Sequence, residues 1–170
     1  MLTPPYSQTL PPKGNQMNIV LHRPEIPHNT GAIGRTCLVA GARLHLIRPY
    51  GFHLDEKSLL RSGLDYWHKL DVSEYDSFQE FIEENPTHRL FLVETVSGKT
   101  YSEACFEPGD YLMFGGETVG LPHEILGMYP ENVVQIPMVR GERSLNLSVA
   151  VGIVLYEALR QGGFEQFTWI

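Results

Sequence analysis

Short apolar runs alternate with stretches of helical periodicity along this chain, and the alternation limits the possible folds more than any other feature. The apolar runs end at proline, glycine or polar residues and predict buried strands at residues 18–21, 44–47, 90–93, 111–114 and 133–136. Helices are predicted between and after them, at residues 29–39, 55–60, 76–85, 123–126 and 144–160. Strands that alternate with helices form a mainly parallel sheet flanked by helices, so the sequence predicts an α/β fold.

The length of 170 residues suits one compact domain. We assign residues 17–170 to it, because the proline-rich segment 1–16 is typical of a flexible extension or of residues foreign to the native chain. Cys37 and Cys105 lack metal-ligand spacing and favour a reducing compartment. No apolar run is long enough to span a membrane. We expect a cytoplasmic protein with no metal and no membrane partner.

The formal net charge of −7 counts against a nucleic-acid partner, because contacts to phosphates need clustered lysine and arginine. Much of the acidic excess comes from residues 74–84. Basic residues nevertheless form local pairs elsewhere: Arg43 with Arg48, Lys57 with Arg61, and Arg140 with Arg143. The charge therefore weakens an RNA-binding interpretation without excluding it.

In open parallel sheets the ligand lies at the carboxyl ends of the strands, so the loops that follow strands are the places to search. The first such loop, residues 24–35, contains Asn29 as the predicted helix cap and Arg35 about two turns into the helix. A capped helix with a solvated arginine is the simpler interpretation. In the second loop, Gly115 and Gly116 allow a sharp turn and a close approach to a ligand, and Glu117 adds a carboxylate. An ordinary turn remains the alternative.

The third loop, residues 134–148, is harder to explain by structure alone. Ser144 suffices to cap the predicted helix, yet Arg143, Asn146 and Ser148 add further polar groups near its start. Free backbone N–H groups at a helix start attract an electron-rich ligand. This concentration of polar side chains predicts a binding site.

Together the three loops resemble the signature motifs of the SPOUT (SpoU–TrmD) RNA methyltransferases, in their SpoU-like branch. The matching segments are N-T-G-A-I-G-R at residues 29–35, L-M-F-G-G-E-T-V-G-L-P at residues 112–122, and I-P-M-V-R-G-E-R-S-L-N-L-S-V-A-V at residues 136–151. The resemblance spans about residues 17–164, with the motifs in the family's order. It departs from many relatives at Gly34, where a larger apolar residue is common, and at Val149, where some have asparagine.

The resemblance implies a sheet whose C-terminal segment threads a deep trefoil knot, which periodicity could not suggest. It implies S-adenosylmethionine as cofactor, leaving S-adenosylhomocysteine as product. It also implies a homodimer in which each active site uses residues of the partner. The apolar stripe of residues 147–158 is consistent either with that interface or with the core. By resemblance, the cofactor contacts are Val93, Gly115, Glu117, Ile136, Ser144 and Leu145.

For catalysis the resemblance implicates Arg35, Asn146 and Ser148, with Asn29, Arg143 and Tyr156 on the substrate side. The family assigns the first-motif arginine to activating the ribose hydroxyl. A guanidinium is a poor general base, because it is not ordinarily deprotonated in proteins. Either its proton affinity is locally lowered, or it anchors the RNA phosphate and stabilises the emerging oxyanion. We favour the second interpretation.

Within the branch, the chain is similar to small enzymes that methylate the wobble nucleotide of leucine tRNAs, cytidine or 5-carboxymethylaminomethyluridine at position 34. The features that favour this are residues 24–27 (PEIP), 49–52 (PYGF) and 63–66 (GLDY). The expected partner is the tRNA anticodon stem-loop. The alternatives are a related enzyme acting on ribosomal RNA or another tRNA position, a non-catalytic RNA-binding knot domain, and a flavodoxin-like nucleotide protein.

Overall fold

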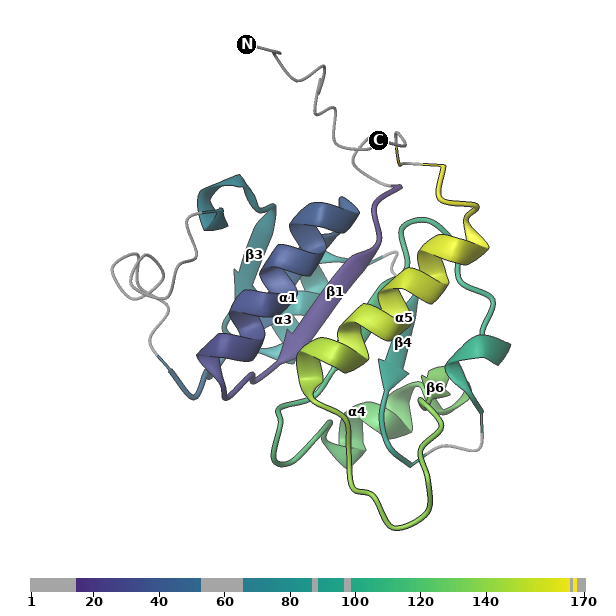
Figure 1. Ribbon diagram of the computed structural model, residues 1–170. Helices are drawn as coiled ribbons and strands as arrows, with labels where there is room; N and C mark the ends of the chain where they lie inside the picture. Colours follow the sequence, from purple (N-terminus) through teal and green to yellow (C-terminus); the bar gives the residue numbers. More distant parts are fainter. Residues whose placement is uncertain (1–14, 53–65, 87–88, 97–98, 166, 168–170) are drawn as a thin grey trace.

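A six-stranded, wholly parallel sheet forms the centre of the molecule (Figure 1). The computed structural model describes residues 15–52, 66–86, 89–96, 99–165 and 167. Its strands are β1 (Asn18–His22), β2 (Arg43–Ile47), β3 (Val72–Tyr75), β4 (Leu90–Val93), β5 (Tyr111–Phe114) and β6 (Val133–Val134). They lie in the order β3-β2-β1-β5-β4-β6. The chain thus extends the sheet to one side of β1 with β2 and β3, and to the other side with β4, β5 and β6. The predicted α/β fold with a parallel sheet is confirmed.

Helices cover both faces of this sheet. Helices α1 (Pro27–Ala40) and α5 (Leu147–Gln161) lie side by side on one face, as Figure 1 shows, and α3 (Phe78–Glu84) and α4 (His123–Met128) pack on the other. Short 3-10 turns occupy Trp67–Lys69, Tyr101–Glu103 and Pro130–Asn132. Alternate residues of each strand point to the two faces, which produces two separate apolar clusters. The buried residues of the α5 stripe, such as Val151 and Leu155, belong to the first cluster, so the stripe is part of the core.

Two predicted helix starts are wrong in position. Helix α1 begins at Pro27, two residues before Asn29, because proline has a backbone angle suited to the first helical turn. Helix α5 begins at Leu147, and the capping residue is Asn146 instead of Ser144. The Asn146 side chain accepts a hydrogen bond from the Ser148 backbone N–H at 2.9 Å. Residues 143–145 consequently stay outside the helix.

Other bounds differ less. Strand β3 was not predicted, because V-S-E-Y contains a single buried residue, Tyr75, and lies at the sheet edge. Strand β6 stops at Val134, two residues before the expected end. The cap of α3 is Ser77, one residue after the expected Asp76. The helix predicted at residues 55–60 lies outside the described part of the chain.

The ends of the fold bear on two further expectations. Gln16, assigned to the extension, is buried, and its carbonyl accepts a hydrogen bond from the Asn18 side chain at 3.1 Å. The trefoil knot stays a prediction, with which the packing of α5 against α1 and β5 is consistent.

Among the described residues, no helix has the length and apolar character needed to cross a membrane. The same residues include no group of three or more histidine, cysteine or acidic side chains placed to hold a metal ion.

A chain of buried and half-buried polar side chains connects β1, β2, β3, β5 and the end of α3. His45, which is fully buried in β2, contacts the Tyr75 hydroxyl through Nδ1 at 2.8 Å and the Asn18 Oδ1 through Nε2 at 3.1 Å. Asn85 donates to the Tyr75 hydroxyl at 3.3 Å and accepts from the Tyr111 hydroxyl at 2.9 Å. Because Asn18 Oδ1 is an acceptor only, His45 must carry its proton on Nε2. We call these five residues the buried network.

Burial also governs the ionisation of two histidines, His45 in this network and His22 at the carboxyl end of β1. Desolvation, with a smaller contribution from Arg43, lowers the pKa of His45 to about 3. Desolvation and the nearby Arg23 likewise lower the pKa of the buried His22 to about 4. Both side chains are therefore neutral in the folded protein near pH 7, as the hydrogen bonds of His45 require.

Candidate functional site

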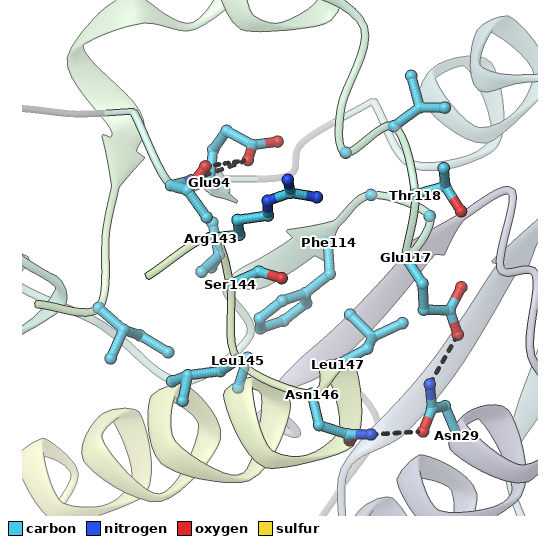
Figure 2. Close-up of a pocket in the computed structure, with 18 of the residues that line it drawn as sticks. Asn29, Glu94, Phe114, Glu117, Thr118, Arg143, Ser144, Leu145, Asn146 and Leu147 are labelled. Carbon is cyan, nitrogen blue, oxygen red and sulfur yellow. Dashed lines mark hydrogen bonds between the residues drawn. The ribbon is translucent and has the colours of Figure 1, made fainter. Parts of the chain in front are cut away.

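A cavity of about 620 Å³ lies beyond the carboxyl ends of β4, β5 and β6 (Figure 2). This is where an open parallel sheet is expected to hold its ligand, and the volume suits a molecule of nucleoside size. Segments far apart in sequence form its wall: residues 26, 29, 93–95, 114–120, 136, 138, 143–147 and 150. All three predicted loops therefore contribute to one cavity.

The glycine turn after β5 brings backbone against backbone. A Cβ at Gly115 would lie 2.0 Å from the carbonyl carbon of Gly120, so no side chain fits there. Gly120 has a φ of +71°, a conformation that favours glycine, and faces the carboxylate of Glu94. The missing side chains therefore let the two arms of the turn pack backbone against backbone, as expected of a sharp turn, and Gly115, Gly116 and Gly120 all line the cavity.

A chain of side-chain hydrogen bonds links the three loops. Asn29 Nδ2 donates to the Glu117 carboxylate at 3.0 Å, and Asn146 Nδ2 donates to the side-chain oxygen Oδ1 of Asn29 at 3.0 Å (Figure 2). Asn146 Oδ1 in turn accepts from the Ser148 hydroxyl at 2.6 Å. We call these four residues the site network. It ties the starts of α1 and α5 to the glycine turn, and so sets the shape of the cavity wall.

Glu25 strengthens the same junction, and sequence reasoning gave it no role. Its backbone N–H donates to the Glu117 carboxylate at 2.8 Å. In return its own carboxylate accepts from the Thr118 hydroxyl and from the Thr118 backbone N–H, the latter at 3.2 Å. A Cβ at Gly116 would lie 2.8 Å from this carboxylate, so the second glycine leaves room for it. An acidic residue in a loop directly after a buried strand was the available signal.

Glu94 is the second residue that the sequence analysis missed. It follows β4 directly, lines the cavity, and accepts a hydrogen bond from the Leu121 backbone N–H at 2.9 Å. A second bond, from the Thr95 N–H at 2.8 Å, holds the other oxygen. The search of loops after strands would have found Glu94 had it included the loop after β4.

The segment before α5 supplies the remaining wall. Arg143, Ser144 and Leu145 are exposed and line the cavity. Arg143 forms no ion pair with any residue in the described ranges. The cavity wall thus has carboxylates at Glu94 and Glu117 and one cation at Arg143. Such a mixture suits a ligand that has both charges.

The structure brings nine of the twelve predicted site residues to this wall: Asn29, Val93, Gly115, Glu117, Ile136, Arg143, Ser144, Leu145 and Asn146. Ser148 lies just outside and belongs to the site network. Tyr156 is exposed on α5 and stacks on Phe167, with 6.5 Å between the ring centroids. Arg35 is exposed on α1, outside the cavity, with its guanidinium carbon 4.2 Å from the centre of the Tyr66 ring.

The expected basic clusters are partly neutralised. Arg43 pairs with Asp71 at 3.2 Å, and Arg48 pairs with Glu74 at 2.8 Å and Asp76 at 2.7 Å. Lys57 and Arg61 lie outside the described residues. The pair Arg140 and Arg143 is exposed beside the cavity. Local positive charge is therefore present where a phosphate could approach the site.

Comparison with known proteins gives the same assignment as the motifs. Residues 16–156 match the model of the SpoU rRNA methylase family. The chain is 48% identical over 149 residues to the tRNA (cytidine(34)-2'-O)-methyltransferase of Escherichia coli (strain K12), which covers 87% of this chain and 95% of that relative.

Solved structures agree with this match. One that concerns the 2-OH methylation of C/U34 on tRNA has a TM-score of 0.82 and 44% identity, and covers 89% of this chain and 99% of that chain. The SpoU methyltransferase AviRb from Streptomyces viridochromogenes, in complex with the cofactor AdoMet, has a TM-score of 0.76 and 25% identity, and covers 90% of this chain and 60% of that chain. The protein described here belongs to the SpoU rRNA methylase family.

Proposed function

We propose that this protein transfers a methyl group from S-adenosylmethionine to the ribose 2′-hydroxyl of the wobble nucleotide of tRNA, cytidine or a modified uridine at position 34. The observation that carries the proposal is the cavity in which all three signature loops meet. The position in tRNA rests on the relative named for cytidine 34 and on the solved structure concerned with C/U34.

The cavity fits the cofactor by its chemistry. The bare backbone at Gly115 and Gly120 allows a nucleoside to approach, and apolar Leu145 and Leu147 suit its base. The carboxylates of Glu94 and Glu117 suit its positive charges. We assign contacts to Val93, Gly115, Glu117, Ile136, Ser144 and Leu145. When bound, S-adenosylmethionine supplies a methyl group on a positively charged sulfur.

The chemistry at the ribose requires one bond to form and one to break. The 2′-oxygen would take the methyl group, the carbon–sulfur bond would break with its electron pair going to sulfur, and the hydroxyl proton would pass to solvent water. In our assignment Arg35 binds the RNA phosphate and stabilises the negative charge that develops on the oxygen. Asn146 and Ser148 orient the reacting groups, and Asn29, Arg143 and Tyr156 contact the RNA side.

Arg35 lies on the outer side of α1 and does not line the cavity of its own chain. We therefore assign the reaction to a homodimer, in which Arg35 of one copy serves the cavity of the other. Exposed apolar side chains on α1 and α5 support this assembly: Val39, Val149 and Tyr156, with exposed fractions of 63%, 50% and 41%. These side chains are distinct from the stripe predicted from sequence, which is buried in the core.

The test is to incubate the protein with labelled S-adenosylmethionine and total tRNA, and to map the methylated nucleotide. Label on the ribose of position 34 in leucine tRNAs, whose anticodon stem-loops are the expected partners, supports the proposal. Label at another tRNA position or in ribosomal RNA would overturn the substrate assignment. Calorimetric titration with S-adenosylhomocysteine distinguishes an enzyme from a non-catalytic RNA-binding domain, because the latter has no reason to bind it.

The matched variant is Arg35→Ala. We expect it to abolish methyl transfer, by at least about a hundredfold, because it removes a charge that acts on the transition state. Its affinity for S-adenosylhomocysteine should stay close to that of the unchanged protein, since Arg35 lies outside the cavity. Equal loss of both properties would mean that Arg35 only supports the fold.

A further inference from the structure

Two aromatic residues of the segment that follows β2 pack onto α1 at the level of Arg35. Tyr66 is buried, with an exposed fraction of 7%, and Trp67, which begins the 3-10 turn, is half-buried. Tyr66 ends the segment GLDY, which the proposed chemistry leaves without a role. The contacts of the Tyr66 side chain indicate what role it has.

Tyr66 contacts both the side chain of Arg35 and a backbone carbonyl one helical turn before it. Its ring lies under the Arg35 guanidinium, with 4.2 Å from the guanidinium carbon to the ring centre. Its hydroxyl donates a hydrogen bond to the carbonyl of Gly31. In an α-helix that carbonyl is the one to which the backbone N–H of Arg35 is directed, since the bond spans four residues. One buried side chain thus contacts both the charged end and the helical turn of Arg35.

The absence of a side chain at Gly34 lets the turn approach α1 this closely. A Cβ at Gly34 would lie 2.8 Å from Cζ3 of Trp67 and 3.2 Å from Cδ2 of Leu70. Trp67 therefore packs directly on the helix backbone, one residue from Arg35. This contact fixes the turn, and with it the neighbouring Tyr66 ring.

We propose that Tyr66 is a positioning residue for Arg35. Its ring lies against the guanidinium and limits the rotamers that this long, exposed side chain can adopt. A planar cation held in one orientation presents its donors in a fixed direction to a phosphate or an oxyanion. This role rests on the proposed function, because it gives Tyr66 a part in the step that Arg35 serves.

The test compares Tyr66→Phe with Tyr66→Leu. Phenylalanine keeps the ring below the guanidinium and loses only the hydroxyl, so kcat should stay within about twofold while thermal stability falls. Leucine removes the ring, and kcat should fall about five- to tenfold with unchanged affinity for S-adenosylhomocysteine. The matched control is Tyr50→Leu, which removes a comparable ring 5.6 Å from the guanidinium carbon of Arg48, away from Arg35 and the cavity, and should leave kcat unchanged. Equal kcat in the two Tyr66 variants would overturn the proposal.

A second measurement does not depend on activity. An aromatic ring shifts the NMR resonances of groups lying over its face, so the side-chain resonances of Arg35 should be shifted in the unchanged protein and in Tyr66→Phe. They should move to ordinary positions in Tyr66→Leu. If the unchanged protein fails to methylate tRNA while these shifts are present, the proposed function is wrong and the contact is real. Absence of the shifts in an active enzyme would refute the positioning role alone.

Discussion

The buried network and the site network are built from similar side chains, yet they lie in different surroundings. In the buried network, His45 is fully enclosed and both of its ring nitrogens are hydrogen-bonded. In the site network, Asn146 is exposed, Ser148 is half-buried and Glu117 lines a cavity, and only Asn29 is buried. The buried network connects strands of the sheet and the end of α3, and the site network connects three loops around the cavity.

This difference separates stability from function within one sheet. A buried polar group that loses its partner has no water to replace it, so the cost appears as lost folding free energy. A solvent-accessible group that loses its partner can bind water instead, so the folding free energy changes little. What changes is the arrangement of the side chains around the cavity. We therefore expect changes in the buried network to affect unfolding, and changes in the site network to affect binding and rate.

The largest expected effect is that of His45→Leu. It removes the buried imidazole that bonds the side-chain oxygen Oδ1 of Asn18 and the Tyr75 hydroxyl. We expect this loss to cost about 2–5 kcal/mol in unfolding free energy. Urea denaturation measures it, and methyl transfer per folded molecule should be unchanged at low temperature. In the double variant with Tyr75→Phe the two losses should not add, since one unsatisfied hydroxyl is removed. Simple additivity would contradict the network.

Gly115→Ala should have the next largest effect, and it tests the cavity instead of the buried network. Its methyl group would meet the backbone of Gly120, so the glycine turn must open. We expect the affinity for S-adenosylhomocysteine, measured by calorimetry, to fall at least about a hundredfold. Gly127→Ala in α4, where a methyl group meets nothing within 4 Å, is the control and should bind normally. Normal binding by both variants would remove the glycine turn from the site.

Asn146→Ala should reduce kcat about tenfold and unfolding free energy by about 1 kcal/mol, because it removes both the link to Asn29 and the cap of α5. Asn146→Ser distinguishes the two effects. Serine restores a cap but cannot donate to Asn29 as the amide does, so stability should recover and kcat should not. Recovery of kcat together with stability would show that Asn146 acts only as a cap.

The effect that is smallest near neutral pH is a dependence of stability on pH, which appears only as the solution becomes acidic. The pKa of His45 is lowered from 6.5 to about 3 by burial, so the fold favours its neutral form. Between these values the unfolded chain binds a proton that the folded protein does not, so the contribution is complete above pH 6.5 and is lost as pH falls toward 3. His45→Leu should flatten the slope of unfolding free energy by about 1 kcal/mol per pH unit within this window. An unchanged slope would contradict burial of the neutral form.

Much of the fold was predictable, because strands buried on both faces are continuous apolar runs. Strands β1, β2, β4 and β5 follow this rule, and the helix α5 was predictable from its apolar stripe at helical spacing. Strand β3 does not, since it lies at the sheet edge, where few side chains are buried and its pattern resembles that of a loop. The cap of α5 was misplaced for a local reason. Ser144 and Asn146 have similar capping preference, and only the bond to Asn29 distinguishes them.

The candidate site was predictable wherever a side chain follows a strand. Residues 115–117 and the polar residues Arg143, Ser144 and Asn146 were found in this way, whereas Leu145 came from the family resemblance, and Glu94 was available to the same rule. The partners of Arg35 were not predictable from periodicity. Contacts between α1 and Tyr66 join residues about thirty positions apart in sequence, and depend on the missing side chain at Gly34.

The order of the segments around the cavity has a consequence during protein synthesis. The chain leaves the ribosome from its N-terminus, so β1, α1 and the glycine turn emerge before residues 136–147, which complete the wall. A partly synthesised chain therefore has no finished pocket. A ligand of this cavity selects finished molecules, and stabilises them by an amount that grows with its concentration.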